Sequence, residues 1–352
     1  MAELIDVPPG LAGVAVADTE IGDVLGDQGF YHYRGRSAPE LARTSNFATV
    51  AALVLDGSSE PLAGDRSLPP QLAELIPHLD LRSAVALLGG ALDMRPMIDI
   101  DRPQRRADAV RLIAVLPTVV ASAYHHQALE PDPTLGPVTD YLRLITGTLP
   151  SPEVAAALEA YFVLALDHGF NNSAFATRVV ASAGADLGAC VLAGFLSLTA
   201  PRHGADIERV LEMFDGIGHP DRAEEWMKAE IAARRVLQGF GHSVYRRVDP
   251  RLELLRQHGT VVAPERHRLA MAAETAGSSL LAGRRLAPNI DLHAAVVLEG
   301  CGIPRGWFAA TFAAARVVGW CAHALEQADE RKIMRPAARY VGPPPDDPAA
   351  WG

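Results

Sequence analysis

The sequence has few aromatic residues, few cysteines and no excess of positive charge. Aromatic residues are only 6% of the 352, so the core must be built mainly from Ala, Val and Leu, and this favours helices. The three cysteines, Cys190, Cys301 and Cys321, are an odd number in apolar sequence, as expected for small buried side chains in a reducing compartment. A net charge of −10 argues against a nucleic-acid partner.

Several fingerprints of cofactor and metal chemistry are also absent. No GxGxxG follows a predicted strand, and GxxxxGK[ST], CxxC and HExxH do not occur. The stretch MAELIDVPPG lacks a basic region followed by an apolar run, so no secretory signal is expected. The sequence therefore predicts a cytoplasmic chain without nicotinamide, P-loop or zinc-peptidase chemistry.

Helical patterns cover most of the chain, apart from one hairpin near its start. Residues 27–29 (DQG) predict a turn, and FYHYRG after them predicts a short strand. Residues 127–152 hold five prolines and are expected to be irregular. Residues 179–200 carry one charge, Asp186, and could cross a bilayer by length, but their Ala, Gly and Ser content favours one long buried helix.

The stretch GFGHSVYRRVDPR, residues 239–251, concentrates polar chemistry in a short space. Gly239 and Gly241 allow the backbone to approach a ligand closely, and His242 can donate or accept a hydrogen bond near neutral pH. Arg246 and Arg251 offer guanidinium forks that suit carboxylate or phosphate oxygens. The stretch predicts an anion site containing a titratable group; the alternative is a polar loop with solvated arginines.

Three histidines share a setting next to a glycine at the boundary of a predicted element, where loops carry function. They are His168, His203 and His242. A helix begins after His203, and the positive end of that helix would keep the imidazole neutral. Asp291, in PNIDLH, is a candidate general base. Its alternative role is to cap the helix that follows.

With these motifs in order, the chain resembles the citrate synthase family from about residue 10 to residue 342. GFGHSVYRRVDPR is similar to that family's Gly-x-Gly-His signature, which ends in Asp-Pro-Arg, and DHGFNNSAFATRVVAS is similar to its histidine–asparagine segment. PNIDLH resembles the loop that carries its catalytic acid. FAAARVVGWCAHALEQ and RPAARYVGP resemble its two C-terminal arginine motifs.

The resemblance implies an all-α, citrate synthase-like fold with a short N-terminal β-hairpin, assembled as a homodimer. Residues 1–204 and 306–352 would form the large domain and the tail. Residues 205–305 would form a small domain that carries the CoA-side and catalytic loops. The active site would lie in the cleft between the domains, which closes over substrate.

The resemblance also implies roles for individual residues in the condensation of acetyl-CoA with oxaloacetate. Asp291 would take a proton from the acetyl methyl group, His203 would donate to the thioester oxygen, and His242 would hydrogen-bond the ketone. The oxaloacetate carboxylates would be held by His168, Arg251 and Arg316, while Arg335 would complete the partner subunit's site. Coenzyme A would lie near Gly239, Phe240, Gly241 and Arg246. The reaction requires no metal or cofactor, because the acyl-CoA is a substrate, and no membrane partner is expected.

Three alternatives stay open. A 2-methylcitrate synthase would use propionyl-CoA in the same chemistry. A non-catalytic relative would bind a dicarboxylate or CoA as a sensor, because Arg202 and Ile207 depart from the family's usual residues around His203. The three histidines could also be ligands of a metal hydrolase, although their spacing matches no known ligand motif.

Overall fold

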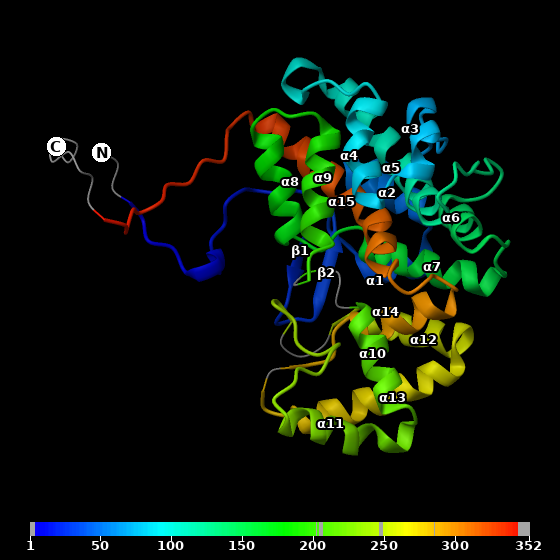
Figure 1. The fold of residues 1–352 in the computed structure, drawn as a ribbon. Coiled ribbons are helices and arrows are strands. Elements are labelled where there is room, and N and C mark those ends of the chain that lie inside the picture. Colours follow the sequence, from blue (N-terminus) through cyan, green and yellow to red (C-terminus); the bar gives the residue numbers. More distant parts are fainter. Residues whose placement is uncertain (1–3, 202, 204–206, 246–248, 285, 344–352) are drawn as a thin grey trace.

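The computed structural model of the protein describes residues 4–201, 203, 207–245, 249–284 and 286–343. In these residues helices build almost the whole fold, and the strands β1, β2 and β3 lie near the N-terminus (Figure 1). The fold class expected from the sequence, all-α with a short N-terminal hairpin, is confirmed.

The hairpin is anchored to the body by two buried tyrosines. Strand β1 (Gly22–Leu25) pairs antiparallel with β2 (Phe30–Tyr33), which pairs antiparallel with β3 (Arg36–Ser37). The Tyr31 hydroxyl donates to the Leu164 carbonyl at 3.1 Å, and the Tyr33 hydroxyl donates to the Val163 carbonyl at 2.9 Å. Because a buried hydroxyl needs a partner, these bonds fix the hairpin to the end of the helix before His168.

Most of the remaining helices form one body, which occupies the upper part of Figure 1. They start where side chains can cap them: Asn46 accepts from the Thr49 amide, and Asp101 accepts from the Gln104 amide. In chain order this body contains α1 (Ala38–Thr44), α2 (Phe47–Asp56), α3 (Pro70–Leu75), η2 (Ile76–His78), α4 (Leu81–Ala91), η3 (Met97–Asp99), α5 (Arg102–His125), α6 (Pro137–Thr146), α7 (Pro152–Ala165), α8 (Asn172–Ser182), α9 (Leu187–Leu198) and α15 (Phe308–Glu330). The short helix η1 (Pro9–Leu11) instead lies on the N-terminal segment outside this body.

Two helices, α5 and α15, are long and apolar enough to cross a membrane by length and composition. Their most apolar windows are 78% and 83% buried inside the fold, and the two helices pack against each other. Their burial is that of core helices in a folded domain.

The apolar stretch of residues 179–200 is two helices, so the expectation of one long helix is wrong. Helix α8 ends at Ser182, and Gly184 turns the chain with a φ of +83°. The Asp186 side chain then accepts from the Ala189 amide and caps α9. The single charge that interrupts the apolar run is a helix cap.

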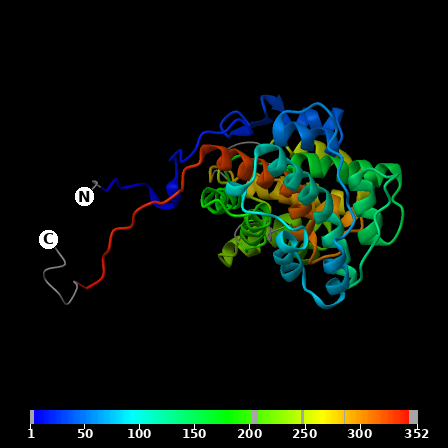
Figure 2. The same ribbon diagram turned by 90° about the horizontal axis from the view of Figure 1, so that it is seen from above.

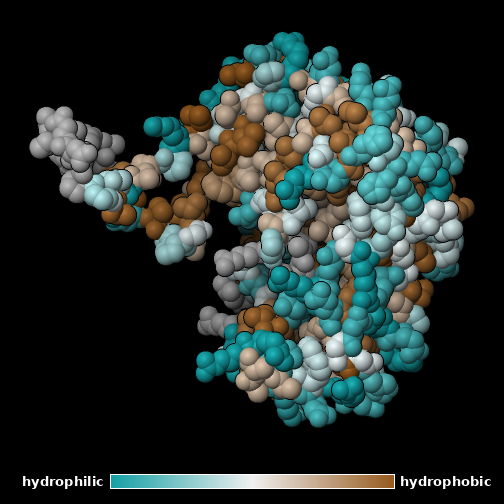
Figure 3. Space-filling view, viewed as in Figure 1, coloured by the Kyte–Doolittle hydropathy of each residue, from teal (hydrophilic) through white to brown (hydrophobic). Residues whose placement is uncertain are grey.

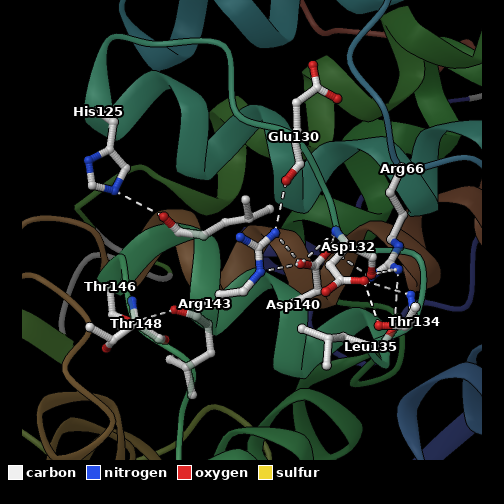
Figure 4. A network of polar contacts seen from close by, with 12 residues as sticks. Arg66, His125, Glu130, Asp132, Thr134, Leu135, Asp140, Arg143, Thr146 and Thr148 are labelled. Atoms are coloured by element: carbon white, nitrogen blue, oxygen red, sulfur yellow. Dashed lines mark hydrogen bonds and ion pairs between the residues drawn. The ribbon is translucent and has the colours of Figure 1, made fainter.

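The proline-rich region of residues 127–152 is also more ordered than expected, because it contains α6. Asp140 on this helix is buried and accepts from Arg66 at 2.9 Å and from Arg143 at 2.7 Å. It also accepts from the Asp132 backbone amide at 3.1 Å (Figure 4). One carboxylate thus ties two loops to α6, an interaction between distant residues that proline content does not reveal.

A second group of helices lies together in the lower part of Figure 1. It contains α10 (Ile207–Ile217), η4 (Pro220–Arg222), α11 (Ala223–Ala232), α12 (Leu252–Val262), α13 (Pro264–Leu280) and α14 (Asp291–Gly300). Helices α12 and α14 pack against α7 of the first group. The predicted domain boundaries at residues 204 and 305 stay a prediction.

The two terminal segments run outward side by side, away from the body, in both ribbon views (Figures 1 and 2). An ion pair of 2.8 Å between Asp6 and Arg339 joins them. Both segments expose apolar side chains, including Ile5 and Val341. The predicted site residue Arg335 is exposed on the C-terminal segment.

Candidate active site

A cavity of about 640 Å³ gathers most of the residues that the sequence singled out. Its walls come from the hairpin, the turn before α8, His203 between α9 and α10, residues 241–244 together with Arg251, the loop before α14, and α15. The side chains that carry chemistry there are His168, His203, His242, Arg251, Asp291 and Arg316. These six residues, which span 148 positions from His168 to Arg316, therefore meet in one place.

The residues expected near coenzyme A separate into two groups. Gly241 lines the cavity. A Cβ on Gly239 would instead meet Leu292 of α14 at 2.9 Å, and the Phe240 ring packs on Gly277 of α13. The Phe240 ring is therefore engaged in packing, and the predicted place of Phe240 near coenzyme A stays a prediction. Arg246 lies outside the described residues.

Arg335 stands apart from this arrangement. Among the residues that the structure describes, those lining the cavity do not include it. Its predicted role in the partner subunit's site therefore stays a prediction.

Arg251 is buried at the cavity wall, where it forms an ion pair with Asp249. Its Nε and Nη2 donate to the two oxygens of Asp249 at 2.8 and 2.7 Å. Asp249 also accepts from the Ile290 amide at 2.9 Å. Since this bond reaches the residue before Asp291, one buried carboxylate links the predicted substrate arginine to the predicted base.

Arg316 is buried on α15 with far less compensation. Its Nε donates to the Ala165 carbonyl at 2.7 Å, and its guanidinium carbon lies 4.7 Å from the centre of the Phe312 ring. In the described part of the chain, Ala165 is its only hydrogen-bond acceptor. A buried guanidinium with unused donors at a cavity wall can bind an incoming carboxylate.

His168 is a neutral imidazole at the cavity wall. Its Nε2 shares a hydrogen bond of 2.9 Å with the Tyr245 hydroxyl. Burial is the main reason that the pKa of His168 falls well below its usual value, and the positive charge of Arg251 lowers it further. A neutral imidazole in this position can bind an anion only by donating a hydrogen bond.

The backbone sets the tautomer of His242. Its Nδ1 lies 3.0 Å from the Val244 amide and 3.1 Å from the Tyr245 amide, and both amides donate to it. Because Nδ1 accepts, the neutral ring carries its proton on Nε2, which can then donate. The ring stands at 86° to that of His168, with centroids 5.3 Å apart.

His203 is a third histidine with a fixed orientation. Its Nε2 lies 3.0 Å from the Ser173 hydroxyl at the start of α8. Burial, followed by the charge of Arg316, lowers the pKa of His203 to about 4. The ring is therefore neutral near pH 7, as expected from the sequence, although burial is the main cause.

The loop that carries Asp291 is held by its neighbour Asn289. The Asn289 amide and side chain donate to the Gly239 and Gly241 carbonyls at 2.9 and 2.8 Å, and its side-chain oxygen accepts from the Asp291 amide. Gly239 and Gly241 adopt φ values of +78° and +92°, which favour glycine. Helix α14 begins at Asp291 itself, with Ile290 at the cap position. Asp291 is therefore the first residue of the helix and not its cap.

The sequence did not single out three residues that position this site, Asp249, Asn289 and Tyr245. Asp249 precedes Arg251 by two residues, and an Asp-x-Arg spacing is a signal for an ion pair. Asn289 precedes Asp291 by two residues, a spacing at which Asn side chains bond the backbone. The contact of Tyr245 with His168 joins distant residues and has no local signal.

The arrangement can abstract a proton and stabilise negative charge. Asp291 supplies a carboxylate, His203 and His242 can donate hydrogen bonds, and Arg316 has unused donors. Among the described residues no group of three or more His, Cys, Asp or Glu side chains is placed to hold a metal ion. The metal-hydrolase alternative therefore has no ligand set in this part of the chain.

Comparison with known proteins agrees with the geometry. The family profile described as citrate synthase, C-terminal domain, matches residues 10–337. A putative citrate synthase 2 of Mycobacterium tuberculosis is 34% identical over 97% of this chain and 94% of its own length. A 2-methylcitrate synthase of the same organism is 32% identical over 96% of this chain and 91% of its own.

A solved structure extends the likeness to three dimensions. The citrate synthase of Thermoplasma acidophilum, in a ternary complex with carboxymethyl coenzyme A and oxaloacetate, superposes with a TM-score of 0.89. It is 25% identical, and the match covers 99% of this chain and all of that one. The resemblance drawn from the motifs and the enzyme class that it implied, a carbon–carbon bond-forming acyltransferase, are confirmed. The chain belongs to the citrate synthase family.

Proposed function

We propose that this protein condenses acetyl-CoA with oxaloacetate and water to give citrate and CoA, as in the tricarboxylic acid cycle. The observation that carries the proposal is the convergence of Asp291, three histidines and two buried arginines on one cavity. A relative from Deinococcus radiodurans that is described as a citrate synthase is 30% identical to this chain, which supports citrate as the product.

In the first step Asp291 takes a proton from the acetyl methyl group. A carbon acid is a weak proton donor, so a carboxylate suffices only if the charge that appears on the thioester oxygen is stabilised at once. Neutral His203, held by Ser173, supplies the hydrogen bond to that oxygen. The product of this step is an enol or enolate of the thioester.

In the second step the nucleophilic carbon attacks the ketone of oxaloacetate. His242 donates from Nε2 to the ketone oxygen as it gains charge, while His168, Arg251 and Arg316 hold the two carboxylates. Water then attacks the thioester carbonyl, the carbon–sulfur bond breaks, and citrate and the CoA thiol leave. Asp291, at the start of α14, and His203 act on one substrate, and the other four residues act on the second.

A second candidate function is 2-methylcitrate synthesis from propionyl-CoA. The relative with this name is about as similar as the relatives named citrate synthase. One methylene in an apolar pocket changes binding by only about 1 to 3 kcal/mol, so the two reactions need only a small difference in the acyl pocket.

We also propose a homodimer in which Arg335 completes the partner subunit's site. Helices α8 and α9 lie on the side of the body from which the terminal segments protrude, and they expose apolar side chains such as Val179 and Leu196. Figure 3 shows apolar residues along the protruding segments and on the adjacent face of the body. A single chain leaves these surfaces in water, whereas a second copy would cover them. The cytoplasmic location stays a prediction.

Release of free CoA thiol tests the proposed reaction. Purified protein mixed with oxaloacetate should release CoA from acetyl-CoA with a higher kcat/KM than from propionyl-CoA. A clear preference for propionyl-CoA would make 2-methylcitrate synthesis the function. No release above background with either acyl-CoA, from protein of dimer mass, would favour the sensor alternative.

Mixing two inactive variants tests the shared site. Asp291→Ala and Arg335→Ala should each be inactive alone, and exchange of subunits should restore activity, because a mixed dimer contains one intact site. Failure of the mixture to recover any activity, with subunit exchange shown by mass, would contradict the role of Arg335.

A further inference from the structure

The N-terminal hairpin touches the cavity, yet the proposed function gives it no part. Asp23 and Val24 of β1 line the cavity beside His168 and Gly169. The hairpin is also anchored where the site begins, because the Tyr33 hydroxyl, which bonds the Val163 carbonyl, lies 3.1 Å from the Asp167 carbonyl as well. Its position therefore depends on the same segment of chain that holds His168.

Val24 fills a space that a side chain after His168 would otherwise take. Gly169 has a φ of +62°, and a Cβ built on it would lie 3.0 Å from Cγ2 of Val24. That distance is tighter than an ordinary van der Waals contact. The Val24 side chain thus closes the corner of the cavity that the glycine leaves open.

This corner belongs to the end of the cavity with the predicted carboxylate ligands. Val24 pairs directly across the hairpin with Tyr31, so the two side chains share a face. The Tyr31 ring lies 5.1 Å from the His168 ring and 6.0 Å from the guanidinium carbon of Arg251. Val24 therefore lies next to residues that are predicted to hold the oxaloacetate carboxylates.

The hairpin turn reaches the loop that fixes His242. A Cβ on Gly26 would lie 2.4 Å from the Val244 carbonyl oxygen, so only glycine fits there without moving that backbone. The Val244 amide is one of the two donors that hold Nδ1 of His242. Gly26 is thus in contact with the peptide chain that orients the predicted ketone ligand.

We propose that the β1–β2 hairpin is a working part of the 2-oxo acid site. Val24 limits the size of the group that fits beside His168, and Gly26 is a positioning residue that seats the His242 loop. The occupant of this corner is a 2-oxo dicarboxylic acid, and the residue at position 24 selects against a substituent on its C3. This inference rests on the proposed function for the identity of the ligand.

Substitution of Gly26 tests the positioning role. Because displacement of a positioned group by about 1 Å can cost 10²-fold, Gly26→Ala should raise both the Kd and the KM for oxaloacetate by about 10- to 100-fold. The KM for acetyl-CoA should stay within about twofold. The control is Gly35→Ala, at the next turn of the same sheet, where a Cβ meets nothing within 4 Å and the φ of +79° strains only the local backbone. Equal effects of the two variants, or an unchanged Kd in Gly26→Ala, would overturn the role.

Substitution of Val24 tests the size limit. Val24→Ala should raise the ratio of kcat/KM for 3-methyloxaloacetate over oxaloacetate by about tenfold, and Val24→Leu should lower it by a similar factor. An unchanged ratio in both variants would overturn the assignment.

Calorimetry with oxaloacetate alone separates this inference from the proposed reaction. A wild type that binds oxaloacetate but releases no CoA contradicts the reaction and leaves the comparison of Gly26→Ala with Gly35→Ala as the test of the hairpin. If the wild type releases CoA, and Gly26→Ala and Gly35→Ala both bind oxaloacetate as tightly as the wild type, only the proposed role of the hairpin is contradicted. If the wild type does not bind oxaloacetate, the result contradicts both the proposed reaction and the proposed role of the hairpin.

Discussion

Two arginines buried on facing helices, Arg178 on α8 and Arg316 on α15, have opposite surroundings. Arg178 donates to Nδ1 of His323 at 3.1 Å and to Oε1 of Gln327 at 3.2 Å, and it pairs with Glu326 and Glu330. Arg316 lies against the cavity and, in the described residues, donates only to the Ala165 carbonyl. Their exposed fractions are 0% and 1%, so burial does not distinguish them.

The difference separates a structural arginine from a substrate-binding one. A buried cation is costly unless anions and acceptors compensate it, and the protein itself compensates Arg178. Arg316 forms no ion pair in the described residues, so only more distant charge, chiefly that of Asp167, offsets its burial until a carboxylate enters the cavity. Arg251 is intermediate, since Asp249 already pairs with it at the cavity wall. Two variants, each of which replaces one of these arginines, test this comparison in three predictions.

Loss of Arg316 should have the largest effect on activity. Arg316→Leu should lower kcat/KM for oxaloacetate by about 10²- to 10³-fold, because removal of a buried charge that binds a carboxylate costs at least 2 kcal/mol. The free energy of unfolding should change little, because an apolar residue replaces a charge with few partners. Steady-state kinetics and urea unfolding measure the two quantities. A large loss of stability with normal kinetics would place Arg316 in the structural class.

Loss of Arg178 should give the converse result. Arg178→Met should lower the free energy of unfolding by about 3 kcal/mol, because it leaves carboxylates and His323 without their buried partner. The KM for oxaloacetate of the folded fraction should stay near the wild-type value. Urea unfolding measures the free energy of unfolding, and steady-state kinetics on the same preparations measure the KM. A raised KM without a loss of stability would contradict the structural role.

The smallest effect expected is on the titration of His203. Burial first and Arg316 second lower its pKa to about 4, so Arg316→Leu should raise this pKa while leaving it below 6.5. Arg178→Met should leave it unchanged. Because the unfolded state binds more protons between about pH 4 and 6.5, His203 makes folding less favourable as the pH falls through this window. NMR titration of the ring, assigned with His203→Gln, measures the shift; equal shifts in both arginine variants would disprove the dependence on Arg316.

Much of the site could be predicted because its chemistry lies in short local motifs. His242 and Arg251 occur in one stretch, and the loop before Asp291 has its own pattern of proline, asparagine and apolar residues. The hairpin and several helix starts also follow local rules, since turn residues and caps act within four positions.

The rest depends on contacts between distant residues. The bond from Tyr245 to His168 spans 77 positions, and the bond from Asn289 to Gly241 spans 48. No periodicity indicates these pairs, nor the fit of Gly26 against Val244. The break at residues 183–186 has a different cause. A single charge in an apolar run does not by itself indicate a helix end, yet Asp186 caps α9.

Release of CoA by wild type and Asp291→Ala is the most direct test of the central claim that the cavity is the active site of a condensing enzyme. Wild type should release CoA from acetyl-CoA only when oxaloacetate is present. Asp291→Ala should lose turnover by about 10²-fold or more, as expected for loss of a general base, while its Kd for oxaloacetate stays within about threefold. Near-wild-type release of CoA by Asp291→Ala would contradict the account.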